Sequence, residues 1–253
     1  IATARGADAL VDDAATFAGG GGDIVVTCDA LAAGVHFFAD DPPEAIAAKA
    51  LRVNLSDLAA KGAEPFGYVL ALALGRGTDV DWVRGFADGL AADNRRYGVD
   101  LLGGDTLRAS DGGGTTISVT AFGRTPPGAI VRRRAAKAGD AILVTGTIGD
   151  AALGLAARLA GEAADTALLD RYLYPEPPVA AWRAVREHAS ASMDVSDGLA
   201  GDLAKLCRAA GVGAVLAADR VPLSPAVAAL VAEKPAARDV ALTGGDDDQI
   251  LAT

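Results

Sequence analysis

The sequence predicts a protein of the α/β class (α+β type) built from two successive units. Patterns of strand, helix, strand, helix, strand and strand follow one another in the first half, in the order of a compact α/β unit. Pro126, Pro127 and Gly128 then interrupt the pattern, so we expect domains at residues 1–127 and 128–253. Only 5% of the 253 residues are aromatic while 51% are hydrophobic, so Ala, Leu and Val must build most of the core.

Two helices of the first unit have clear start and stop signals. Pro42 precedes a stretch with apolar residues at helical spacing, and Gly62 follows it. Asp79 is a typical N-cap for the second helix, and Gly98 is a typical C-terminal stop. The predicted strands of this unit lie at residues 23–28, 66–74, 99–102 and 115–123.

The second unit alternates strand and helix patterns in the same way. Strands are predicted at residues 141–145, before Met193 and at 212–217, and helices from Asp150, at 179–188 and after Asp197. The chain stops at Thr253, just after an apolar, strand-like run, so we expect a further C-terminal part of this domain.

Composition excludes several classes of function. A formal net charge of −10 disfavours a nucleic-acid surface, since the one basic cluster is Arg132–Arg134 with Lys137. Cys28 and Cys207 lie far apart and form no zinc motif. We find no signal peptide and no apolar run long enough for a membrane span, so a cytoplasmic protein is expected.

Aspartate motifs recur where predicted strands end or helices begin, which is where α/β proteins build ligand sites. Gly–Asp and Asp–Gly pairs are also common in turns, so it is the repetition that favours a site. The motifs are Asp12-Asp13, Thr27-Cys28-Asp29, Asn54-Leu55-Ser56-Asp57, Gly103-Gly104-Asp105-Thr106, Asp194-Val195-Ser196-Asp197-Gly198 and Gly244-Gly245-Asp246-Asp247-Asp248.

These carboxylates point to a divalent cation. An aspartate at the end of an apolar strand is costly unless it is paired, and few basic residues lie near these motifs in sequence. Mg²⁺ favours carboxylate and phosphate oxygens, and such ions spread the charge of phosphoryl transfer. The sequence contains no Walker P-loop and no protein-kinase motif. We therefore expect a nucleotide to be bound through metal ions.

Three features have alternative interpretations. Asn54, Asp57 and Lys61 form one polar stripe on the first predicted helix, which is either a solvated face or part of the metal site. Arg132–Arg134 is either a solvated turn or a phosphate clamp. His36 follows the Asp29 motif, so a substrate contact is an alternative to a structural role.

Six stretches, in order along nearly the whole chain, resemble thiamine-monophosphate kinases. The most specific are the long stretch around Asn54–Asp57 and the run Asp194–Leu199. The stretches are Asp12–Ala15, Thr27–Leu31 with Gly34–Phe37, Lys49–Pro65, Leu102–Thr106, Gly146–Leu155 and Met193–Leu199.

The resemblance implies a two-domain fold of the superfamily that includes aminoimidazole ribonucleotide synthetase. It implies a homodimer in which the sheets of two first domains pair into a β-barrel. It also implies Mg²⁺-dependent transfer of the γ-phosphoryl group of ATP, bound between the domains, onto thiamine monophosphate, which gives thiamine diphosphate.

The resemblance also implies roles for particular residues. The implied metal ligands are Asp13, Thr27, Cys28, Asp29, Asp57, Asp105, Asp194 and Asp197. The implied ATP contacts are Gly104, Asp105, Arg133, Ser196 and Asp88, and the implied thiamine monophosphate contacts are His36 and Asp246. Cys28 stands where the family usually has Thr, so a contact there is expected from its backbone.

This chain departs from the family pattern near its end. Asp248 and Gln249 occupy positions where the family usually has Tyr and Glu, and the family continues well past Thr253. Two alternatives to the kinase therefore stay open. One is another ATP-dependent enzyme of the superfamily, and the other is a non-catalytic nucleotide- or metal-binding relative with an altered acceptor site.

Overall fold

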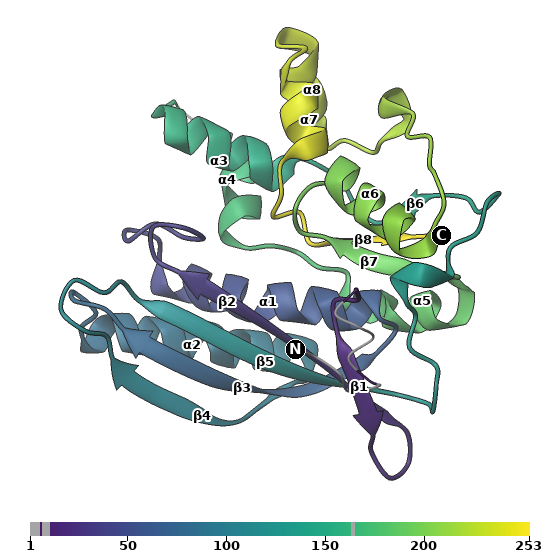
Figure 1. Ribbon diagram of the computed structural model, residues 1–253. Coiled ribbons are helices and arrows are strands. Elements are labelled where there is room, and N and C mark those ends of the chain that lie inside the picture. Colours follow the sequence, from purple (N-terminus) through teal and green to yellow (C-terminus); the bar gives the residue numbers. More distant parts are fainter. Residues whose placement is uncertain (1–5, 7–10, 163–164) are drawn as a thin grey trace.

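The computed structural model describes residue 6, residues 11–162 and residues 165–253. The first half of the chain forms a five-stranded sheet and the second half a three-stranded sheet (Figure 1). In these described ranges, no helix is long and apolar enough to cross a lipid bilayer. The architecture is the two-unit α/β arrangement that the sequence predicts.

The first sheet has the strand order β1-β2-β5-β3-β4. Its pairs are antiparallel except β3 with β4, which run parallel because a helix connects them. The strands are β1 (Ala15–Ala18), β2 (Asp23–Ala32), β3 (Glu64–Leu74), β4 (Asp100–Arg108) and β5 (Thr116–Thr125).

Helices α1 (Pro43–Ala60) and α2 (Val80–Tyr97) pack on one face of this sheet (Figure 1). Buried residues alternate along β5, as expected for a strand with one covered face. The caps of α2 are those that the sequence predicts, since the Asp79 carboxylate accepts from the Trp82 N–H and Gly98 has φ 67°.

The second sheet is small and antiparallel, with the order β6-β8-β7. Its strands are β6 (Leu143–Val144), β7 (Ser192–Val195) and β8 (Gln249–Ala252). The helices of this unit are α3 (Asp150–Ala160), α4 (Thr166–Leu173), α5 (Trp182–His188), α6 (Leu199–Ala210), α7 (Pro225–Glu233) and α8 (Ala237–Thr243).

Helix α1 joins the two units. One side packs in the core of the first sheet, and Ala59 and Ala60 pack against Trp182 and Ile250 of the second unit. Figure 1 shows α1 between the first sheet and the second unit. As a result 15 of its 18 residues are buried, including polar ones.

Two predicted strands differ from the structure. The short strand expected at 99–102 runs on to Arg108, because pairing with β3 continues through the Gly103-Gly104-Asp105 motif. The strand expected at 212–217 does not form, since none of the strands among the described residues lies alongside it to complete a ladder. The sequence reading also missed β1, α4, α7 and α8.

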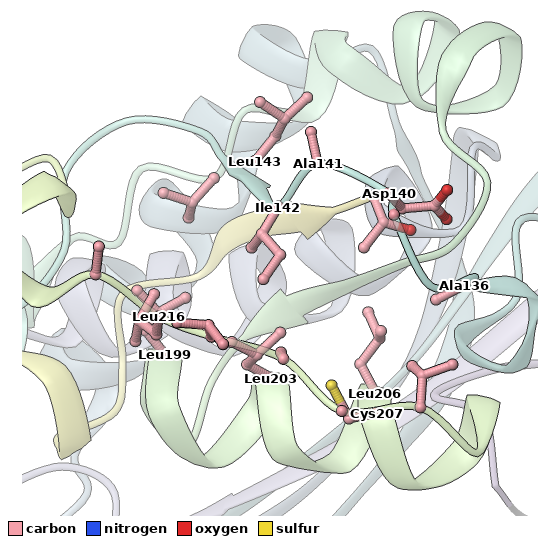
Figure 2. Close-up of a pocket in the computed structure, with 18 of the residues that line it drawn as sticks. Ala136, Asp140, Ala141, Ile142, Leu143, Leu199, Leu203, Leu206, Cys207 and Leu216 are labelled. Carbon is pink, nitrogen blue, oxygen red and sulfur yellow. The ribbon is translucent and has the colours of Figure 1, made fainter.

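Instead of pairing, segment 212–217 lines a cavity of about 620 Å³ together with residues 136–144 and α6. Figure 2 shows its apolar wall, to which α6 contributes Leu199, Leu203 and Leu206. The only carboxylate among its lining residues is Asp140, so this cavity is chemically distinct from the aspartate motifs.

Candidate active site

Three of the predicted metal ligands meet between the two units. One carboxylate oxygen from each of Asp13, Asp57 and Asp194 lies within 4.8 Å of the other two. They come from the segment before β1, from α1 and from β7, so the fold gathers residues that are distant in sequence. Asp57 is 7% exposed and Asp194 is 3% exposed.

The polar stripe of α1 is buried, so its interpretation as a solvated face is wrong. Asn54 and Lys61 are both 0% exposed. The Lys61 ammonium lies 2.6 Å from Asp12 and 2.9 Å from Asp13, and it donates to the Ser192 carbonyl of β7 at 3.0 Å. A buried lysine requires such partners. Lys61 thereby holds the N-terminal segment, α1 and β7 together.

Strand β2 presents alternate residues to α1. The Thr27 hydroxyl donates to the Asp57 carboxylate, and the Asp29 N–H donates to Asn54 Oδ1 at 3.1 Å. The intervening Cys28 side chain is exposed and contacts Ser118 and Thr120 of β5 on the opposite face. A metal contact from Cys28 would therefore have to come from its backbone, which is the form expected from the sequence.

The cluster holds more negative charge than its surroundings compensate. Burial raises the pKa of Asp57 well above its ordinary value, and the neighbouring Asp194 and Asp29 raise it further. Burial likewise raises the pKa of Asp194 to about 6, although Lys61 lowers it. Carboxylates this destabilised must take up protons or bind a cation, and an oxygen-rich set suits Mg²⁺.

Arg133 lies against the cluster. Its Nε donates to Asp13 Oδ2 at 3.1 Å, and a second guanidinium nitrogen pairs with the same carboxylate. Burial lowers the pKa of Arg133, whereas Asp12 and Asp194 raise it. The sequence left Arg132–Arg134 as either a solvated turn or a phosphate clamp. For Arg133, these contacts exclude the solvated turn.

The two residues implied for the acceptor, His36 and Asp246, lie on either side of one lysine. Lys49 Nζ is 2.9 Å from Asp246 Oδ2 and 3.2 Å from the His36 carbonyl oxygen. The ammonium also sits 4.0 Å from the centre of the Tyr172 ring. Lys49 is 4% exposed, so α1 positions this group as well.

A polar cavity of about 770 Å³ adjoins this lysine-linked pair. Acidic side chains dominate its charged lining, and one aromatic ring, that of Tyr174, joins them. The acidic lining residues are Asp150, Asp170, Glu176, Asp246 and Asp247. Arg171 is the one basic residue that lines it. The arrangement favours a ligand with a cationic group.

Four predicted residues lie apart from the cluster. Gly104 and Asp105 are exposed on the edge strand β4, three strands away from β2. Asp88 is exposed on α2 and lines a different cavity with Glu44 and Arg52. Asp197 is exposed and pairs with Lys205.

Ser196 lies nearer the acceptor pair, because its carbonyl accepts from the Asp246 N–H at 2.9 Å. Among the described residues, sequence reasoning assigned no role to Asp12, Lys49, Lys61 or Asp248. A role for Lys61 could have been predicted from the sequence, since it shares a helical stripe with Asp57. Lys49 gave no such signal, because its acidic partner Asp246 is distant in sequence. Asp248 belongs to one of the aspartate motifs, but the resemblance gives it no role because the family usually has Tyr there.

Comparison with known proteins matches both halves of the chain to one family. Residues 11–125 match the N-terminal domain of AIR synthase related proteins, and residues 137–251 match the C-terminal domain. The AaThiL complex with AMPPCP and TMP superposes with a TM-score of 0.89 at 31% identity, covering 97% of this chain and 81% of that one.

Two curated relatives support the assignment of this chain to a family. The thiamine-monophosphate kinase of Salmonella typhimurium is 40% identical over 235 residues, which are 91% of this chain and 70% of the relative. That of Caulobacter vibrioides is 46% identical over 248 residues, which are 96% of this chain and 70% of the relative. At this identity and coverage, the chain belongs to the thiamine-monophosphate kinase family.

Proposed function

We propose that this protein transfers the γ-phosphoryl group of ATP to thiamine monophosphate and forms thiamine diphosphate and ADP, with Mg²⁺ as the metal. The observation that carries the proposal is the carboxylate cluster of Asp13, Asp57 and Asp194 between the units. The relatives named above have this activity in their names, and the AaThiL complex contains both ligand types.

The site performs its proposed chemistry by position and charge. Asp13, Asp57 and Asp194 would hold Mg²⁺, with Thr27 and Asp29 beside Asp57, and the ion would neutralise the phosphates and lower the barrier to in-line transfer. Arg133 is placed to contact a phosphate beside Asp13. No covalent intermediate is needed, since the acceptor is already a phosphate oxyanion.

The acceptor is proposed to bind at His36 and Asp246. Thiamine monophosphate carries a cationic thiazolium ring, which suits the acidic cavity beside Asp246 and the ring of Tyr174. Lys49 is placed at the same point and could meet the phosphate end. The geometry thus supports an acceptor site next to the metal cluster.

A homodimer would account for Gly104 and Asp105. Strand β4 is an unpaired edge, and Leu102 and Leu107 on it are 56% and 55% exposed. In the part of the chain that the structure describes, no helix covers the sheet face opposite α1 and α2. Pairing of two such sheets into a barrel would cover the edge strand β4 and the open face of the sheet. It would also bring Asp105 towards the second copy of the chain.

The proposed ATP contacts have unequal support. Arg133 and Ser196 lie beside the cluster and the acceptor pair, and Gly104 with Asp105 depends on the dimer. Asp88 stays a prediction that the geometry does not favour, because it faces the cavity on the α2 side. Asp197 would have to leave Lys205 to bind a metal.

The second candidate function is a binding protein without catalysis. Asp248 and Gln249 favour it, because they replace the usual Tyr and Glu beside the proposed acceptor contact. Formation of thiamine diphosphate from ATP, Mg²⁺ and thiamine monophosphate separates the two. A protein that binds ATP and Mg²⁺ but forms no product would be the binding protein.

Asp57→Asn should lower the rate of thiamine diphosphate formation by about a hundredfold or more, since it removes a central ligand. The free energy of unfolding in EDTA should not fall, because the change removes a buried charge that Asp194 and Asp29 oppose. Asp81→Asn is the matched control, an exposed residue on α2. Equal rates for parent and Asp57→Asn would exclude Asp57 from the site.

His36→Ala should raise the apparent KM for thiamine monophosphate by about tenfold to a hundredfold, the effect of one lost charge-assisted contact. The Kd for ATP–Mg²⁺ measured by calorimetry should stay the same. The other histidine, His188, is 78% exposed, and His188→Ala is the matched control. Loss of ATP–Mg²⁺ binding in His36→Ala would contradict this division of the site.

Light scattering at micromolar concentration should give twice the mass of one chain. Leu102→Asp places a charge on the exposed edge strand and should shift the protein towards monomer. Leu159 is 68% exposed on α3 of the other unit, so Leu159→Asp should leave the mass unchanged. A monomeric parent protein would refute the dimer.

A further inference from the structure

Gln249 is a buried residue in the wall of the acidic cavity next to Asp246. The residue is 7% exposed and lines that cavity of about 770 Å³. Segment 174–176 forms one wall of the cavity, and Asp246 with Asp247 forms another. A primary amide has two donor hydrogens and an acceptor oxygen, so a buried one needs several partners. The partners of Gln249 therefore show which parts of the cavity it connects.

The amide nitrogen of Gln249 donates to both walls. Nε2 lies 3.0 Å from the Glu176 carbonyl oxygen and 3.3 Å from the Asp247 carbonyl oxygen. These carbonyls belong to separate parts of the chain, since segment 174–176 follows α4 and Asp247 lies between α8 and β8. Each hydrogen of the amide thus has an acceptor on a different wall, and one side chain links the two.

The surrounding hydrogen bonds fix the orientation of this amide. The Thr145 hydroxyl accepts from the Ile250 N–H at 2.8 Å, and it donates its own hydrogen to Gln249 Oε1 at 3.0 Å. The other end of the amide faces two carbonyl oxygens, which can only accept. A reversed amide would place its oxygen against both carbonyls. The network therefore requires a donor at this end, and a carboxylate would not supply one.

The neighbouring backbone leaves room for the Gln249 side chain. Gly146 has φ 57°, in the left-handed region that favours glycine. A Cβ at this position would lie 2.3 Å from Gln249 Oε1 and 2.7 Å from its Cδ. A side chain at residue 146 would therefore displace Gln249 from its partners. Gly146 also lines the same cavity, so both residues shape one region of its wall.

Each wall is also anchored to another element. Arg52 of α1 donates to the Glu176 carboxylate at 3.1 Å and to the Pro175 carbonyl at 2.9 Å. The Asp247 carboxylate accepts from the Gly149 N–H, directly before α3, at 2.9 Å. Gln249 bridges these two anchored segments. Loss of its amide would therefore change their separation while each keeps its own anchor.

We propose that Gln249 is a positioning residue for the acceptor site, and that it sets the distance between the two walls that enclose thiamine monophosphate. It acts through Glu176 and Asp247, whose carbonyls it holds. The proposal rests on the acceptor site proposed above. It also gives a role to a residue at which this chain departs from the family pattern.

Calorimetry of thiamine monophosphate binding to the whole chain tests this role. Gln249→Met removes the amide and leaves two buried carbonyls without a donor, so the Kd should rise by about tenfold. The Kd for ATP–Mg²⁺ should stay the same, because these bonds lie outside the carboxylate cluster. Ser190→Ala is the matched control, since Ser190 Oγ bonds Asp140 and Thr253 away from this cavity. It should leave both constants unchanged.

Gln249→Glu separates position from charge, and it introduces the residue that the family usually has. Its carboxylate would face the carbonyl oxygens of Glu176 and Asp247, so this variant should also bind thiamine monophosphate about tenfold more weakly. If the charge of the cavity mattered more than the distance between its walls, the added carboxylate would tighten binding of the cationic substrate. Tighter binding by Gln249→Glu, or an unchanged Kd in Gln249→Met, would overturn the proposal.

NMR gives a readout that does not depend on activity. Gln249 is the only glutamine in the 253 residues, so isotope labelling of glutamine isolates its side-chain amide. The amide hydrogens should exchange slowly with water, and their shifts should change when thiamine monophosphate binds. Fast exchange would overturn the proposal. A parent protein that bound thiamine monophosphate but formed no thiamine diphosphate would refute the kinase function alone, and one that did not bind it would refute both.

Discussion

Helix α1 is buried between the two sheets, and each buried polar side chain on it or at its C-terminal end must therefore find a partner inside the protein. Lys61 meets that requirement with Asp12, Asp13 and the Ser192 carbonyl, and Lys49 meets it with Asp246 and the His36 carbonyl. These contacts join the N-terminal segment, the first sheet and the second unit. The position of one helix thus fixes the relative placement of the whole candidate site.

The same position explains the electrostatics of the site. The helix brings Asp57 to a place where Asp194 of the second unit and Asp29 of β2 already lie. Unpaired charges of one sign oppose burial, so closure of the two units is costly for the protein alone. A divalent cation would reverse that cost, and metal binding would then stabilise the contact between the units. Nucleotide binding and domain placement would share one set of residues.

Local signals in the sequence were enough for most elements and for the chemical character of the site. Asp79 and Gly98 correctly predicted the two ends of α2, because helix capping depends on neighbouring residues alone. The prediction of a strand at 212–217 was wrong, because a strand also needs a neighbouring strand to pair with, and the sequence of the segment does not reveal one. Likewise, nothing in the stripe of Asn54, Asp57 and Lys61 could tell a solvated face from a buried one. That distinction depends on contacts with β2, with Asp12 and Asp13, and with β7, which lie between 25 and 131 residues away.

The most direct test of the central claim is the pH dependence of Mg²⁺ affinity, measured by calorimetry from pH 5 to 8. Burial raises the pKa of Asp194 to about 6 and that of Asp57 well above its ordinary value, so protons compete with the cation at low pH. Mg²⁺ should bind progressively more tightly as pH rises through about 6, with release of protons on binding near that pH. An affinity that does not change over this range, with no proton release, would show that these carboxylates are not the metal site.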